Sequence, residues 1–431
     1  MSTPRFHTKT LSNGLRVAVV PDPNAVAVTA MILVNVGSSF ESKKENGLSH
    51  FLEHVCFKGT VRRPSARAIT EEIESLGAVT NAFTDRELTG YFIKGNPAHV
   101  TSFVDILADI FHHSTFPEAE VAKEKGVIIE EINMYEDMPQ HKVSEILFET
   151  LYPEQSVGRS ILGTKETVRS FSQKDFISYK KRFYTAKNTL LVFSGAVTPT
   201  QALALTKKYF GVLPRSQTNK KPKVKDSQNK IQTVVHKKAT NQAHCVLAFR
   251  SFPLGHKDAA VARIIATILG RGMSSRLSLI IREELGAAYY VYAAQESFTN
   301  HGLFAIASGI DKTRLTEVLT RIVGECNRLI YEAVEEKELS KAKEYTIGTF
   351  RISLETSDSL AEFYGAQMIL RQKIKTPEQM IAAIKKVSPQ DIIRVAKTLF
   401  RASNATVALV GPFSEKDIPV SILQSLGTSV R

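Results

Sequence analysis

The sequence of 431 residues has no long apolar run, and this absence excludes one class of protein. Its longest apolar stretch, Ala25 to Val36, is interrupted by Thr29 and Asn35 and is shorter than the roughly 20 residues needed to cross a bilayer. The first residues, MSTPRFHTKTLSNG, contain no continuous apolar segment of the kind found in a secretory signal. We therefore expect a cytoplasmic protein that does not interact with membranes.

Cysteine is also scarce. The three cysteines, Cys56, Cys245 and Cys326, are far apart and odd in number. This pattern is typical of reduced thiols packed in cores and not of a disulfide framework. No CxxC pair is present that could bind a metal through sulfur. With 43% hydrophobic and 23% charged residues, the remaining composition is that of an ordinary globular protein.

Positive charge exceeds negative charge, with 56 Lys and Arg against 43 Asp and Glu and a formal net charge of +13. Such a charge attracts polyanions or acidic peptides without specifying either, and solubility explains it equally well. Residues 214–230, PRSQTNKKPKVKDSQNK, have no hydrophobic periodicity and are typical of a solvated linker. No aromatic side chains alternate with these lysines to stack on bases, so we expect no nucleic acid partner.

The linker separates two halves that look like copies of one another. Asp175 and Asp391 define an offset of 216 residues at which these segments align without a gap. The identical pairs are Ser172 and Ser388, Asp175 and Asp391, Lys181 and Lys397, Ala186 and Ala402, Asn188 and Asn404, and Gly195 and Gly411. In each copy a serine precedes an amphipathic helix, and an apolar strand follows that ends at the glycine. We therefore predict a duplicated domain, with one copy in residues 1–213 and the other in residues 231–431.

Strand and helix signals alternate within each half. An Asn13-Gly14 turn precedes an apolar stretch that ends at Pro21, and Val26 to Val36 follows almost at once, as in a hairpin or meander. Helical periodicity is found between the strand signals, for example in residues 66–76 and 100–112. This order predicts the α+β class, with a mostly antiparallel sheet in each domain and helices packed on one face.

Residues Gly47 to Gly59, GLSHFLEHVCFKG, carry the clearest chemical signal. Apolar side chains recur at helical spacing, while His50, Glu53 and His54 lie together on the opposite side of the predicted helix. Two imidazoles one turn apart can bind the same Zn²⁺ ion, and the glutamate between them can hold a water beside it. The pattern is H-x-x-E-H, the inverted zinc-peptidase motif. The alternative at this point is a pair of surface histidines on a helix.

A third protein ligand is expected in residues 118–137, which have the periodicity of a second helix. The apolar stripe of this helix comprises Val121, Val127, Ile128, Ile132 and Tyr135. Glu124 and Glu131 fall inside the stripe, whereas Glu130 points away from it. Because an unpaired buried charge is costly, these carboxylates need a cation, either a metal ion or a basic side chain in a salt bridge. We favour Glu131 as the third zinc ligand and Glu124 as the group that orients one of the two histidines.

Further segments in both halves match one protein family. They are LSNGL at 11–15, the Gly37 turn before Glu41, FKGT at 57–60, NAFT at 81–84 with Glu87, VIIEEI around Glu131, GMSSRL at 272–277, and Arg282 with Gly286, Ala288 and Tyr289. Together with HFLEH at 50–54, they resemble the pitrilysin or insulinase-like zinc peptidases, especially the processing-peptidase branch. Leu285 departs from the basic residue common there. The resemblance covers essentially the whole chain.

The resemblance implies a zinc-dependent endopeptidase that cleaves unfolded peptides or precursor segments. One Zn²⁺ per chain would be bound by His50, His54 and Glu131, and Glu53 would be the general base. The second half lacks H-x-x-E-H and would be a non-catalytic domain.

The resemblance also implies residues that bind substrate. Asn81 and Ala82 would lie on an edge strand beside the metal, where the substrate backbone adds as a further strand. Arg282 and Tyr289, from the second half, would hold the peptide carbonyl or the developing oxyanion.

The expected assembly is a pair of chains that closes around a chamber for unfolded peptides. A chain that has both the zinc motif and the Arg282–Tyr289 pair contains the parts of a working homodimer, and a heterodimer with a related chain is the lesser alternative. A different class of function is a catalytically silent scaffold or partner subunit. Such subunits typically lose motif residues, whereas the four that would bind zinc and act as base are all present here, so we favour the peptidase.

Overall fold

The structure is a computed structural model that describes residues 6–215, 219–370 and 373–428. The chain forms two compact units, and neither is continuous in sequence. The first comprises Met1–Asn133, Arg159–Pro222 and Ile352–Ile374, and the second comprises Met134–Gly158, Lys223–Arg351 and Lys375–Arg431. Each unit therefore receives one segment from the other half of the chain. Residues 216–218 of the predicted linker lie outside the described residues.

A six-stranded sheet forms the centre of the first unit. Its strands, in spatial order, are β1 (His7–Thr10), β2 (Arg16–Pro21), β6 (Thr189–Gly195), β3 (Val28–Val34), β5 (Thr89–Gly95) and β4 (Val79–Thr84). Neighbouring strands are antiparallel, except that β2 and β6 are parallel. Strands β3 and β6 are buried along their whole length. Burial on both faces explains why their sequences are continuous apolar runs.

Most helices of the first unit cover one face of this sheet. They are α1 (Leu48–Cys56), α2 (Ala66–Ser75), α3 (Val100–His113), α4 (Glu118–Asp137), α6 (Lys165–Ser170), α7 (Gln173–Phe183) and α8 (Pro199–Phe210). Side chains from all of them join the sheet residues Ile32, Ile93 and Phe193 in one buried cluster. Removal of this apolar surface from water is the main contribution that stabilises the unit.

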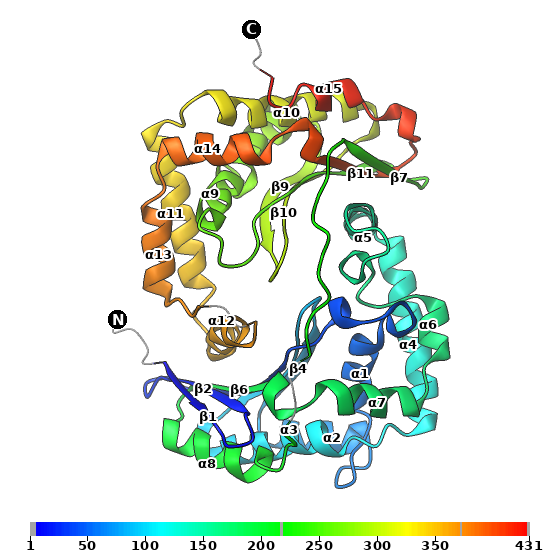
Figure 1. The fold of residues 1–431 in the computed structure, drawn as a ribbon, viewed down its shortest axis with the longest axis vertical. Helices are drawn as coiled ribbons and strands as arrows, with labels where there is room; N and C mark the ends of the chain where they lie inside the picture. Colours follow the sequence, from blue (N-terminus) through cyan, green and yellow to red (C-terminus); the bar gives the residue numbers. More distant parts are fainter. Residues whose placement is uncertain (1–5, 216–218, 371–372, 429–431) are drawn as a thin grey trace. The chain divides into compact units, whose positions relative to one another are not determined.

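The other face of the first sheet is covered by α12 (Ser357–Ile369), which comes from the second half of the chain (Figure 1). Alternate strand residues point to this face, and they form a second buried cluster that includes Met31, Leu33, Val192, Ala361 and Ile369. Gly365 of α12 lies so close to Leu33 that an added Cβ atom would be 2.6 Å from its Cδ1 atom. The small residue therefore permits the close approach of helix and sheet.

The second unit repeats this arrangement. The strands of its sheet, in spatial order, are β7 (Gln232–Lys237), β11 (Ala405–Gly411), β8 (Gln242–Arg250), β10 (Gly302–Asp311) and β9 (Ala288–Ser297). Again one neighbouring pair, β7 and β11, is parallel, and the others are antiparallel. The first sheet has the same order and directions from β2 to β4, with β1 as an additional edge strand.

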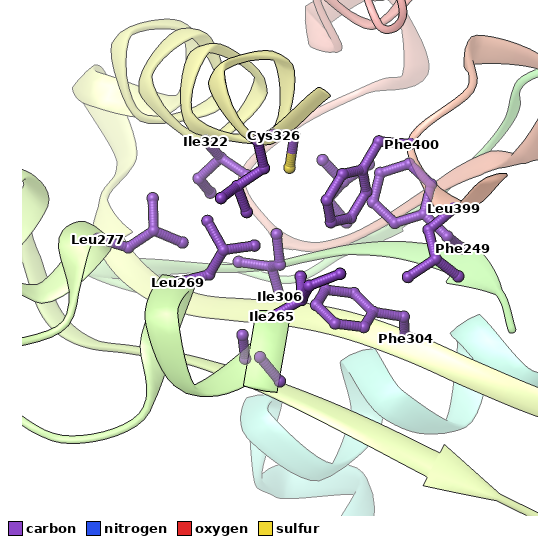
Figure 2. Packing of buried hydrophobic residues seen from close by; sticks show 14 of the residues in the cluster. Phe249, Ile265, Leu269, Leu277, Phe304, Ile306, Ile322, Cys326, Leu399 and Phe400 are labelled. Atoms are coloured by element: carbon purple, nitrogen blue, oxygen red, sulfur yellow. The ribbon is translucent and has the colours of Figure 1, made fainter. Parts of the chain in front are cut away.

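Helices of the second unit also cover both faces of their sheet. On one face lie α9 (Ala259–Gly270), α10 (Leu315–Tyr331), α11 (Glu336–Ile352), α13 (Pro377–Lys385), α14 (Pro389–Leu399) and α15 (Val420–Gln424). Figure 2 shows Phe249, Phe304 and Phe400 close together in the buried cluster that also contains Ile322 and Cys326. The other face packs against α5 (Pro139–Leu151), which comes from the first half of the chain.

A repeated asparagine shows how closely the two copies correspond. Helix α7, a short turn and β6 begin and end at the same offset of 216 residues from α14, its turn and β11. In the first copy, Nδ2 of Asn188 donates to the carbonyl of Phe183 at 2.8 Å, and in the second, Nδ2 of Asn404 donates to the carbonyl of Leu399 at 3.0 Å. Each amide thus satisfies a carbonyl at the carboxyl end of a helix, where intrahelical partners are lacking.

These features confirm the predicted α+β class and the two homologous domains. The cover of the second sheet face by the exchanged helices α5 and α12 was not predicted. Cys56, Cys245 and Cys326 are free and buried, as expected. Within the described parts of the chain, every helix is too short or too polar to span a bilayer.

We predict that Asn188→Ala and Asn404→Ala each lower the free energy of unfolding by about 1–3 kcal/mol, because each variant loses the two hydrogen bonds that the asparagine side chain donates to backbone carbonyls. Chemical denaturation monitored by circular dichroism measures the change. Asn24→Ala removes an exposed amide and should change the value by less than about 0.5 kcal/mol. Equal stability of all three variants would contradict the role given to the repeated asparagine.

Candidate metal centre

Helix α1 is fixed at its amino end by a buried glutamate. Its N-cap residue, Gly47, has a φ of 95°, a left-handed conformation that favours glycine. The carboxylate of Glu41 accepts hydrogen bonds from the backbone N–H groups of Gly47 at 2.8 Å and Ser49 at 2.7 Å. These bonds satisfy donors that have no partner within the helix. Glu41 therefore sets where α1 begins and how it is rotated.

Helices α1 and α4 bring three potential metal ligands together. Oε2 of Glu131, on α4, is 3.7 Å from Nε2 of His50 and 3.8 Å from Nε2 of His54, both on α1. One ligand atom from each residue lies within 4.8 Å of the other two. Ligands at about 2.0–2.2 Å from a tetrahedral Zn²⁺ ion are separated by roughly 3.3–3.6 Å. Small side-chain movements therefore suffice to place the three atoms around one ion.

The charge state of these ligands also suits a metal ion. His50 is 8% exposed, and burial, together with the charge of His54, lowers the pKa of His50 to about 3. Its imidazole is therefore neutral near pH 7 and has a lone pair available for coordination. Burial raises the pKa of Glu131, so this carboxylate would gain from a nearby cation. Two imidazoles and one carboxylate form a donor set that zinc accepts.

Glu124 connects His54 to a lysine. Its Oε1 atom lies 2.8 Å from Nδ1 of His54, and its Oε2 atom lies 2.7 Å from Nζ of Lys58. Burial alone would raise the pKa of Glu124, but these two partners outweigh it, and the pKa is lowered. An ionised Glu124 keeps the proton of His54 on Nδ1 and leaves Nε2 free to bind a metal.

Glu53 lies on α1 next to the edge strand β4. The hydroxyl of Thr84, the last residue of β4, donates to Oε2 of Glu53 at 3.0 Å. Burial raises the pKa of Glu53, and the charge of His54 and the Thr84 hydroxyl only partly oppose this effect. A raised pKa is what a general base that works near neutral pH requires.

Asn81 and Ala82 lie on β4, at the edge of the first sheet. Helix α1 contacts this strand. The N–H group of Ala82 donates to Oδ1 of Asn81 at 2.8 Å. As an edge strand, β4 has one side without a paired strand, and the addition of a substrate strand there stays a prediction.

Arg282 and Tyr289 belong to the second unit. Arg282 lies in the π-helical segment Ser278–Glu284, and Tyr289 lies near the start of β9. Both side chains are exposed, that of Tyr289 to 69%. Their part in binding substrate stays a prediction.

Several contacts of the site received no role from the sequence. Lys58 and Thr84 were recognised only as parts of matching segments, although Lys58 follows His50 and His54 at the same four-residue spacing. The predicted apolar stripe of α4 was partly wrong, because one of its five members, Val127, is 52% exposed. Glu124 is 4% exposed, and Glu130 is exposed, as the helical geometry predicted.

Two family descriptions match the chain. "Insulinase (Peptidase family M16)" matches residues 16–165, and "Peptidase M16 inactive domain" matches residues 170–345. The first range contains the cluster of His50, His54 and Glu131, and the second contains Arg282 and Tyr289.

Similar proteins cover nearly the whole chain. An uncharacterized zinc protease of Bacillus subtilis, YmxG, is 34% identical over 94% of this chain and 97% of its own. The human mitochondrial-processing peptidase subunit beta is 30% identical over 96% of this chain and 86% of its own. The crystal structure of a protease from Helicobacter pylori has a TM-score of 0.89 at 24% identity, with 95% of this chain and 100% of that chain covered, which supports the fold.

We predict that Glu131→Gln loses most bound zinc, whereas Glu130→Gln retains it. The neighbouring glutamates differ in that Glu131 approaches both histidines and Glu130 is exposed. Metal analysis of each purified variant by mass spectrometry measures the zinc content per chain. Full zinc in Glu131→Gln together with its loss in Glu130→Gln would reverse the assignment.

We predict that Glu124→Gln retains the fold but weakens zinc binding by about 10- to 100-fold, because the amide no longer holds the His54 proton as a carboxylate does. Competition with a chromophoric chelator gives the dissociation constant. An unchanged constant would show that Glu124 does not support the metal site.

Proposed function

Because the chain belongs to the insulinase family of peptidases, family M16, we propose that it is a zinc-dependent endopeptidase that hydrolyses unfolded peptides or precursor segments. The observation that carries this proposal is the approach of His50, His54 and Glu131 to one another, with Glu53 beside them. The names of the relatives support zinc as the metal. We propose that each chain binds one ion.

The residues of the site have distinct roles in this proposal. His50, His54 and Glu131 would hold Zn²⁺, which, when bound, polarises the scissile carbonyl and makes a neighbouring water more acidic. Glu53 takes a proton from the attacking water on its carboxylate and returns it to the leaving amine. Thr84 restrains the Glu53 carboxylate through the hydrogen bond to Oε2.

The substrate would be held mainly through its backbone. An extended peptide added to β4 would run past Asn81 and Ala82, and its hydrogen bonds would not depend on side-chain identity. This mode suits unfolded segments of varied sequence. We assign Arg282 and Tyr289 to the peptide carbonyl or the developing oxyanion.

We propose that two copies of this chain form a homodimer that encloses the substrate in a chamber, in the cytoplasm. A heterodimer with a related chain is the alternative, since one curated relative is named as a subunit of a processing peptidase. Size-exclusion chromatography with light scattering of the purified chain distinguishes a self-associating chain from one that needs a partner.

A catalytically silent partner subunit is the alternative function, and the family description "inactive domain" applies to residues 170–345. The complete set of His50, Glu53, His54 and Glu131 favours the enzyme.

We predict that Glu53→Gln retains zinc but cleaves a quenched, unstructured basic peptide at least about 100-fold more slowly, because the general base is lost. Fluorescence release measures the rate. A chelator should abolish cleavage by the parent protein, and added zinc should restore it.

Glu130→Gln provides the matched control, since it changes an exposed glutamate near the site and should leave the rate unchanged. Full activity of Glu53→Gln would refute the mechanism. A parent chain that binds zinc but cleaves no peptide would favour the silent subunit.

A further inference from the structure

The carboxylates around α1 have few basic partners. Glu53, Glu124 and Glu131 influence one another or share His54 as a neighbour. Among the described residues, Lys58 is the one lysine or arginine that forms an ion pair with any of the three. Its Nζ atom is 2.7 Å from Oε2 of Glu124, and the Glu124 side chain is only 6% exposed.

Glu124 links this lysine to one of the proposed metal ligands. Its Oε1 atom is 2.8 Å from Nδ1 of His54, while its Oε2 atom faces Lys58. Loss of the basic partner of a buried carboxylate is strongly destabilising, so Glu124 needs Lys58 to stay in this position.

We propose that Lys58 is a positioning residue of the metal centre, which holds the Glu124 carboxylate in place so that it faces Nδ1 of His54. This inference rests on the proposed zinc site and extends it by one residue. Lys58 binds one carboxylate oxygen, so the other oxygen faces the imidazole. The chain Lys58, Glu124, His54 thus fixes the orientation of one ligand ring.

The fold holds Lys58 in place after the end of α1. The backbone N–H of Lys58 donates to the carbonyl of Val55 at 3.2 Å, so the turn continues the helix. Thr60, two residues later, donates to Oδ2 of the buried Asp109 at 2.5 Å and accepts from the N–H of Arg63 at 2.9 Å. The segment is therefore anchored on both sides of the lysine, which reduces the entropy lost when its side chain is ordered.

The test is the zinc affinity of purified variants, measured by chelator competition. We expect Lys58→Met to lower the affinity by about 10-fold, as for other residues that support metal ligands. Lys58→Arg retains the charge and should stay within about threefold of the parent. Lys123→Met is the matched control, because Lys123 forms an exposed ion pair with Glu120 on the same helix as Glu124. It should leave the affinity unchanged.

A double variant shows whether Lys58 acts through Glu124. In the Glu124→Gln background, Lys58→Met should have little further effect, because the carboxylate that needs the lysine is gone. An unchanged affinity of Lys58→Met, or equal losses with and without Glu124, would overturn the inference. Lys58→Gln serves as a second variant if Lys58→Met does not fold, and circular dichroism of the metal-free proteins checks the fold.

The result is separable from the proposed function. Zinc affinity is measured without a substrate, so a chain that binds zinc through Lys58 but cleaves nothing would refute the endopeptidase and leave the positioning role intact. An active chain whose zinc affinity does not depend on Lys58 would refute the positioning role and leave the proposed endopeptidase intact.

Discussion

The compensation of buried negative charge between α1 and α4 is the constraint on which the site depends. Glu53, Glu124 and Glu131 lie around two histidines, and Lys58 forms an ion pair with one of them, Glu124. If the three carboxylates are ionised and the imidazoles neutral, two negative charges remain, which one Zn²⁺ ion neutralises. Burial raises the pKa values of Glu53 and Glu131, and a neighbouring carboxylate adds to the effect in each case. Electrostatics and geometry thus point to the same cation.

The duplication explains why the described residues contain a single cluster of this kind. When helices α4 and α11 are aligned from their first residues, their buried positions coincide: Val121 corresponds to Leu339, Glu124 to Ala342 and Ile128 to Thr346. The second copy has Ala342 at the position of Glu124, and Thr346, at the position of Ile128, forms a hydrogen bond with Thr267 of α9 at 2.9 Å. The packing of helix on helix is therefore retained, while the charge that a metal would balance is absent. The second domain can keep its fold without the chemistry.

Much of the site could be predicted from the sequence, because helical geometry decides which side chains share a face. The segment from Gly47 to Gly59 was predicted as a helix, and α1 occupies Leu48–Cys56 within it; the same reasoning separated Glu131 from Glu130. Periodicity shows that a face is apolar but not which partner covers it. It therefore did not predict that α5 and α12 each pack on the sheet formed mainly by the other half of the chain. Val127 was also wrongly placed in the buried stripe of α4. The contacts of Lys58 and Thr84 arise from tertiary structure, and no sequence pattern was strong enough to assign a role to either residue.

X-ray absorption at the zinc edge of the purified protein tests the central claim most directly. The account predicts one zinc ion per chain with two imidazole nitrogens at about 2.0–2.1 Å and a carboxylate oxygen at about 2.0–2.2 Å. A chain that takes up no zinc, or a spectrum with sulfur ligands at about 2.3 Å, would contradict it. In either case the approach of His50, His54 and Glu131 would need an explanation other than a shared metal ion.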